Sequence, residues 1–124
     1  MRVRVCGGRD FRQDWLVFRV LADLYEQLPN DEWLRIISGA APKGPDTFAL
    51  EWAWSWHRTG HRVYWEEYPA DWKLYGRAAG PIRNQEMLDS GIDLVIAFPG
   101  GRGTADMVRR ARKAGVEVRE VANG

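Results

Sequence analysis

The sequence predicts an α/β fold: a single Rossmann-like domain with an open, parallel five-stranded sheet and helices on both faces. Short apolar segments alternate with longer segments of helical periodicity along the whole chain. One of them, Leu94–Phe98, is apolar throughout, which is typical of a central parallel strand covered on both faces. Right-handed crossovers then favour the strand order 3-2-1-4-5. A ligand is expected where the first and fourth strands lie side by side and their connections leave on opposite faces.

The first half of the chain alternates strands and helices. The strands are expected at residues 3–6, 33–38 and 62–66. The helices between them are expected at residues 15–28 and 46–58. In the first helix apolar residues recur at spacings of three and four, and Pro29 and Asn30 end the pattern. Asp46 is the expected N-cap of the second helix, which Gly60 closes.

The second half continues the alternation after a long connection at residues 68–80, which is expected to be a loop. The remaining strands are expected at residues 93–98 and 116–121, and the remaining helices at residues 81–88 and 104–114. Pro81 fits the first turn of a helix because its missing N–H is not needed there. Gly115 ends the last helix.

Length and composition exclude several classes of protein. A chain of 124 residues, 45% apolar and 28% charged, fits one globular domain over residues 1–124 and neither a collagen nor a disordered tail. The net charge of +1 favours neither nucleic acid nor a membrane as partner. The single cysteine, Cys6, cannot form an internal disulfide, and no apolar run spans a membrane, so a cytoplasmic location is expected. His57 and His61 lie near no ligand cluster, so no metal is expected. No cofactor is expected either.

Three strand-to-helix loops carry glycine clusters that the fold would bring to one edge of the sheet. Backbone N–H groups of such loops, followed by a helix N-terminus, can bind phosphate. Tight turns also use glycine for geometry alone, and Lys43 reads equally well as a solvated loop residue. The candidate ligand-binding residues in these loops are Gly7, Gly8, Arg9, Ser38, Gly39, Lys43, Gly100, Gly101, Arg102, Gly103 and Thr104.

The start of the third helix adds side chains to the same edge. Arg83 and Asn84 fall in its first turn, where a guanidinium suits a phosphate or carboxylate, although a solvated arginine is the alternative. Tyr68 and Trp72 could stack on a base above the site or anchor their loop in the core. Asp10, like Asp46, has helix capping as its plain alternative.

Several of these segments together resemble the SLOG superfamily, named for the Smf/DprA and Lonely Guy proteins, and in particular its small stand-alone YspA-like branch. The resemblance covers nearly the whole chain and is carried by residues 5–11, 38–46, 68–72, 80–87 and 99–104. Its most specific part is the sequence PGGRGT at 99–104, preceded by RNQEM at 83–87. The resemblance implies a Rossmann-like fold that binds nucleotides or nucleotide-derived ligands. Together with the three glycine-rich loops and Arg83, it favours a binding module with a sensor or sequestering role.

The resemblance also implies an alternative activity. Lonely Guy enzymes are phosphoribohydrolases that cleave the N-glycosidic bond of nucleoside 5′-monophosphates, and Arg83 matches their catalytic arginine. Their essential glutamate is replaced here by Met107. Asp106, Glu86 or Asp10 would have to supply the carboxylate that stabilises an oxocarbenium-like transition state. Binding of single-stranded DNA, known in the Smf/DprA branch, is a weaker alternative because it needs a basic groove.

The second helix carries three of the seven tryptophans. Trp52 and Trp56 share one face, whereas Trp54 points to the opposite side. A helix that covers a sheet needs only one apolar stripe, so the second aromatic face predicts a homodimer through this helix.

Overall fold

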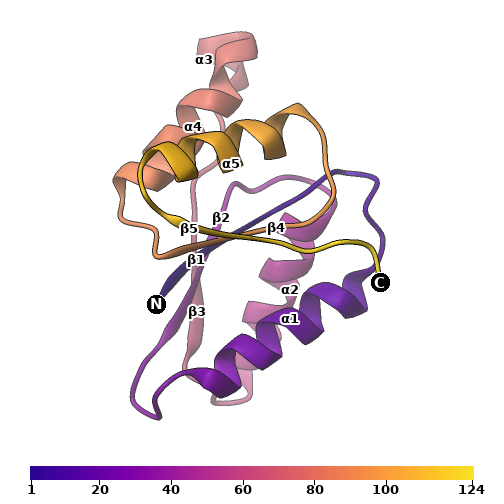
Figure 1. Ribbon diagram of the computed structural model, residues 1–124, viewed down its shortest axis with the longest axis vertical. Helices are drawn as coiled ribbons and strands as arrows, with labels where there is room; N and C mark the ends of the chain where they lie inside the picture. Colours follow the sequence, from indigo (N-terminus) through magenta and orange to yellow (C-terminus); the bar gives the residue numbers. More distant parts are fainter.

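The protein is built on a five-stranded, all-parallel sheet with the order β3-β2-β1-β4-β5 (Figure 1). A computed structural model describes all of residues 1–124. The strands are β1 (Arg2–Cys6), β2 (Leu34–Ser38), β3 (Val63–Glu67), β4 (Leu94–Ala97) and β5 (Glu117–Glu120). The predicted fold class and strand order are confirmed. The switch point therefore lies between β1 and β4, which pair in parallel from Val3↔Leu94 to Cys6↔Ala97.

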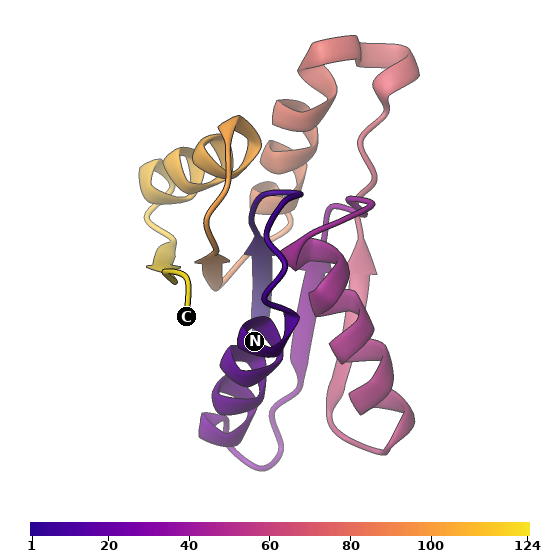
Figure 2. The ribbon, with the colours of Figure 1, turned by 90° about the vertical axis from the view of Figure 1, so that its right-hand side faces the viewer.

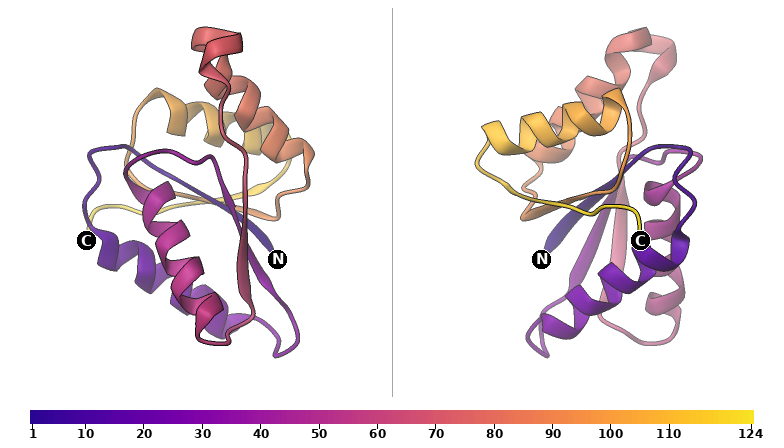
Figure 3. Two further views of the ribbon diagram at one scale, coloured as in Figure 1. Left: turned by 180° about the vertical axis from the view of Figure 1, so that it is seen from behind. Right: turned by 45° about the vertical axis from the view of Figure 1, so that its right-hand side comes forward.

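Helices cover the sheet from both sides, as Figures 1 and 3 show. One face is covered by α1 (Asp14–Gln27) and α2 (Pro45–Arg58). The other face is covered by α4 (Ala79–Asp89) and α5 (Arg102–Lys113). Every predicted strand and helix is present with its ends within two residues of the expected ones. No helix has the length and apolar character of a membrane span.

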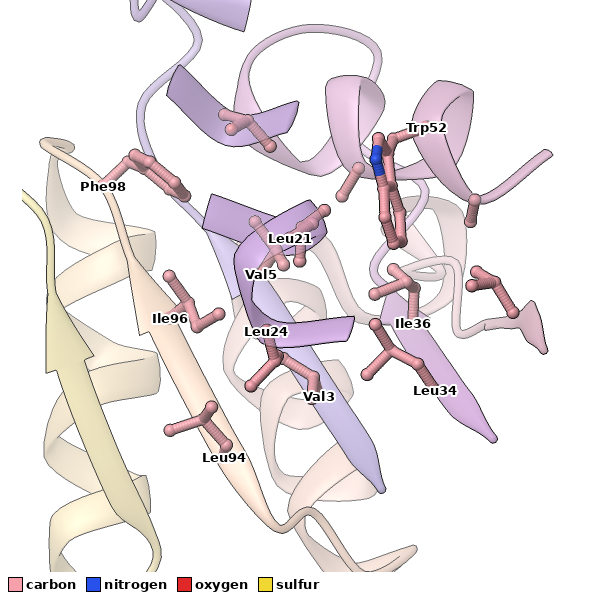
Figure 4. Close-up of a cluster of buried hydrophobic side chains, with 14 of the residues drawn as sticks. Val3, Val5, Leu21, Leu24, Leu34, Ile36, Trp52, Leu94, Ile96 and Phe98 are labelled. Carbon is pink, nitrogen blue, oxygen red and sulfur yellow. The ribbon is translucent and has the colours of Figure 1, made fainter. Parts of the chain in front are cut away.

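Two hydrophobic clusters hold the layers together because side chains alternate along each strand. Val3 and Val5 of β1 point toward α1 and α2, where Leu21 packs against them (Figure 4). The other cluster joins the opposite side of β1, β2 and β4 to α4 and α5, and it includes Cys6 and Met107. The position that carries the glutamate in the Lonely Guy pattern is thus a fully buried core position here.

The connection after β3 is not a simple loop, so the prediction for residues 68–80 is wrong in part. It contains α3 (Trp72–Tyr75) and a 3₁₀ turn (Gly76–Ala78) that leads into α4. Asp71 caps α3 by accepting a hydrogen bond from the Leu74 N–H at 3.0 Å. Figure 2 shows this segment projecting beyond the rest of the molecule.

Two predicted helix caps are also wrong. The N-cap of α2 is Gly44, and Asp46 lies inside the first turn with its carboxylate turned to the loop after β2. The N-cap of α1 is Gln13, so Asp10 lies four residues before that helix begins. Neither aspartate is therefore placed by capping.

The tryptophans of α2 lie as their spacing predicts. Trp52 is buried and its ring centroid lies 4.5 Å from that of Trp56 on the sheet side of the helix. Trp54 is 51% exposed on the outer side, with the guanidinium of Arg58 over its ring. The homodimer through this helix stays a prediction.

Candidate functional site

A cavity of about 740 Å³ lies at the switch point, beyond the carboxyl ends of β1, β2 and β4. Its walls come from the loops after these three strands, from α3 and the 3₁₀ turn, and from the first two turns of α4 and α5. Because α4 begins at Ala79, Arg83 and Asn84 lie in its second turn and not in the first as predicted. Most of the residues predicted for the site line it. These are Gly7, Gly8, Arg9, Lys43, Arg83, Asn84, Gly100, Gly101, Arg102, Gly103, Thr104 and Asp106.

Three predicted residues do not line the cavity. Ser38 and Gly39 are buried at the end of β2, where the Ser38 hydroxyl donates a hydrogen bond to Asp46 Oδ1 at 2.9 Å. Glu86 is exposed on α4, outside the cavity wall. Of the carboxylates considered for catalysis, only Asp10 and Asp106 reach the cavity.

Several of the glycines are explained by close packing of the loops against each other. Gly8 N–H donates to the Pro99 carbonyl at 2.8 Å, which joins the loops after β1 and β4. A Cβ on Gly100 would lie 2.6 Å from Gly8 N, and a Cβ on Gly44 would lie 2.5 Å from Gly8 O. Side chains at Gly44 and Gly100 would therefore separate the loops.

The remaining glycines of the last turn face open space. A Cβ on Gly101 or on Gly103 would meet nothing within 4 Å. Gly101 is the N-cap of α5 and no side chain caps this helix. The first N–H groups of a helix have no partner within it and carry partial positive charge, so this end of α5 can bind an anion in the cavity.

Arg83 and Asp106 are joined through Asn84. The Nε of Arg83 donates to Asn84 Oδ1 at 3.2 Å, and Asn84 Nδ2 donates to Asp106 Oδ2 at 2.9 Å. Asp106 also accepts hydrogen bonds from Arg109 and Arg110. The carboxylate that lines the cavity on α5 therefore fixes the Asn84 amide, which in turn orients Arg83.

These contacts change the titration of Asp106. Burial alone would raise its pKa, but hydrogen bonds from Asn84 and Arg110 and the charges of Arg110 and Arg109 outweigh burial and lower the pKa below its ordinary 3.8. A group whose pKa is lower in the folded state contributes stability above its unfolded pKa and loses that contribution as the pH falls through the folded pKa.

We therefore expect Asp106→Asn to flatten the loss of stability below about pH 4. Urea unfolding of both proteins at pH 7 and at pH 3 measures this. The exposed Asp89, which accepts a hydrogen bond from Gln85 on α4, provides Asp89→Asn as the control. Equal acid dependence of Asp106→Asn and the native chain would contradict the assigned contacts.

A buried ion pair lies beneath the cavity and was not predicted. Arg4 of β1, whose side chain is 6% exposed, donates from Nη1 to Asp46 Oδ1 at 2.8 Å. Asp46 also accepts hydrogen bonds from the N–H groups of Gly39 and Ala41. The sequence could have indicated this pair, because Arg4 lies in the strand that the predicted order places at the centre of the sheet, and a buried charge there needs a partner.

Arg77 also lines the cavity, and nothing in the sequence indicated its position there.

Cys6 borders the cavity but is inert. Burial raises its pKa to about 11, against the smaller opposing effect of the Arg4 charge. Because the thiolate is the reactive form, the raised pKa makes the thiol unreactive, and Cys6 serves as a small apolar residue of the second hydrophobic cluster.

The cavity wall is strongly basic although the whole chain is nearly neutral. Six cationic side chains line it against three carboxylates. Two of those carboxylates, Asp46 and Asp106, are already paired with arginines. The unpaired charge therefore favours an anionic ligand.

A doubly wound parallel sheet with a basic, glycine-lined cavity at its switch point defines a Rossmann-like domain. The chain belongs to the YspA, cpYpsA-related SLOG family, whose model matches residues 1–75. It is also 39% identical over 119 residues to the Gene 61 protein of Mycobacterium phage D29, covering 94% of this chain and 93% of that protein. Family membership supports a nucleotide-related function in general terms.

Proposed function

We propose that the protein binds a nucleotide or nucleotide-derived ligand in this cavity, where the N-terminus of α5 and Arg83 bind its phosphate moiety. The main observation behind this proposal is the uncapped start of α5, which opens into a cavity with an excess of cationic side chains. The volume of about 740 Å³ lies within the range of small-molecule sites.

The opposite part of the cavity wall suits the rest of a nucleotide. Trp72 of α3 is 55% exposed and its Cη2 would lie 3.4 Å from a Cβ on Gly80, so the indole lies over the start of α4 at the cavity. An exposed indole can stack on a base. Tyr68, the other aromatic considered for this role, packs against the second hydrophobic cluster.

The carboxylates favour binding over hydrolysis. Asp106 accepts hydrogen bonds from Asn84 and from two arginines, so its negative charge is already compensated and is less available to stabilise an oxocarbenium-like transition state. Glu86 lies outside the cavity and Met107 is in the core. Asp10 alone remains, on a loop rather than on the helix that carries the glutamate in the Lonely Guy pattern.

Titration calorimetry with a panel of nucleoside 5′-monophosphates and with ribose 5-phosphate tests the proposal. We expect at least one compound to bind, and Arg83→Gln to weaken it by about tenfold to a hundredfold, because a hydrogen bond to a charged group is lost. Arg112→Gln is the matched control, since Arg112 lies on α5 outside this cavity and pairs with Glu120 on the surface.

Chromatography of the same mixtures for free base separates binding from hydrolysis. We expect none. Release of base that disappears in Asp106→Asn would replace the binding proposal with phosphoribohydrolase activity. Absence of heat with every phosphate compound would overturn the proposal itself.

A further inference from the structure

The guanidinium of Arg4 has donors that the protein does not use. All of its hydrogen bonds, to Asp46 and to the carbonyls of Val5 and Ile37, are made by Nη1. Its Nε is buried without a partner, and the residue lines the cavity. A buried donor without a hydrogen-bond partner destabilises the protein unless a bound ligand or water supplies an acceptor.

A second guanidinium lies beside it. A Cβ on Gly39 would lie 2.8 Å from Arg83 Cζ and 3.1 Å from Arg4 Nη2, so both groups pack against the bare Cα of Gly39. Arg83 itself donates to two neutral groups, the Gly39 carbonyl and the Asn84 amide oxygen. Burial lowers the pKa of Arg83, as does the charge of Arg4, while Asp46 acts in the opposite direction.

Asp46 pairs with Arg4, whereas Arg83 forms no ion pair with a carboxylate. One positive charge of the pair is left without a counter-charge in a partly buried position. Like charges held together in this way indicate a place for an anion that is supplied by a ligand.

The start of α5 is a separate anion-binding element in the same cavity. Asn84 lies between the two elements: its Oδ1 accepts from Arg83, and its Nδ2 lies 3.4 Å from the Gly103 carbonyl. Neither element neutralises the other, because both are positive.

We propose that the ligand carries two phosphoryl groups, one bound by Arg4 and Arg83 and the other by the N-terminus of α5. This inference rests on the proposed function and narrows it to the class of nucleoside diphosphates or bisphosphates. The excess of cationic side chains on the cavity wall agrees with a ligand of more than two negative charges.

Calorimetry in magnesium-free buffer tests it on the native chain. For the nucleoside that binds best in the panel above, the 5′-monophosphate, the 5′-diphosphate and the 3′,5′-bisphosphate are compared. We expect one of the doubly phosphorylated compounds to bind about tenfold or more tightly than the monophosphate, and which of the two does so identifies the linkage. Inorganic pyrophosphate should likewise compete better than phosphate if the groups are adjacent.

Arg4→Lys keeps a charge for Asp46 but removes the spare donors, so the advantage of the doubly phosphorylated compound should shrink to within about threefold. Arg112→Lys, outside the cavity, should leave the advantage intact. Equal affinity of the native chain for mono- and doubly phosphorylated compounds overturns the inference, even if Arg4→Lys fails to fold. Failure of every nucleotide to bind would instead overturn the proposed function.

Discussion

Replacing Gly100 by alanine is expected to lower the free energy of unfolding by about 2–3 kcal/mol and to abolish ligand binding. The added Cβ would lie 2.6 Å from Gly8 N and 3.0 Å from Gly7 C, and it would also meet Thr104 Oγ1. The hydroxyl of Thr104 can rotate away, but the backbone of the β1 loop cannot. The loops after β1 and β4 would separate, the hydrogen bond from Gly8 to Pro99 would break, and both walls of the cavity would move.

Gly103→Ala is the matched control, because it adds the same methyl group in the first turn of α5, where nothing lies within 4 Å. We expect this variant to lose no stability, since alanine is favoured over glycine within a helix. Urea unfolding measures both variants. Equal stability of the two would show that the glycine contacts between the loops do not hold the site together.

This pair also shows what glycine clusters in a sequence can and cannot predict. They correctly indicate where strand-to-helix turns lie and which edge of the sheet carries the cavity. They do not distinguish a glycine that contacts a neighbouring loop, such as Gly8, from one that faces open space, such as Gly103. That distinction depends on contacts between segments about 90 residues apart in the chain, and the sequence around each glycine does not predict such contacts.

The strands and their order could be predicted because each strand–helix–strand connection in a parallel sheet is right-handed. The run Leu94–Phe98 indicated an interior strand of the sheet, and it is buried on both faces. The short helix α3 could not be predicted in the same way. It has no buried residue and is held by the cap from Asp71, so it lacks the apolar periodicity by which longer helices are recognised.

Side-chain roles at the site were harder to predict than its position. The spacing of Asp106 on α5 shows only that it points away from Met107 by about 100°. Its role depends on Asn84, which lies 22 residues earlier and uses the carboxylate as an anchor. Arg4 alternates with Val3 and Val5, and such a pattern fits a solvent-facing side chain as well as a buried ion pair.

The largest single loss of stability is expected for Asp46→Ala, at about 3–5 kcal/mol. The substitution leaves the buried guanidinium of Arg4 without a carboxylate. It also removes the acceptor for the Ser38 hydroxyl and for the N–H groups of Gly39 and Ala41. Breaking one side of a buried pair costs more than the pair contributes, because the remaining charge stays desolvated.

Glu117→Ala is the control for losing a carboxylate from an ion pair, since Glu117 pairs with Arg119 on the exposed strand β5. Its expected cost is below about 1 kcal/mol. Urea unfolding compares the two variants with the double variant Arg4→Leu/Asp46→Asn, which removes both charges together and should regain part of the stability that Asp46→Ala loses.

A cost for Asp46→Ala as small as that for Glu117→Ala would contradict the buried pair. It would also remove the reason for regarding Arg4 as fixed in place beneath the cavity. If the cost is large and the double variant recovers stability, the charge of Arg4 is retained in the native chain against a real desolvation penalty. If Arg4 and Asp46 had only a structural role, apolar side chains could replace the pair without this desolvation penalty. Retention of a costly charge at the floor of the cavity is therefore what an anion-binding role for Arg4 predicts.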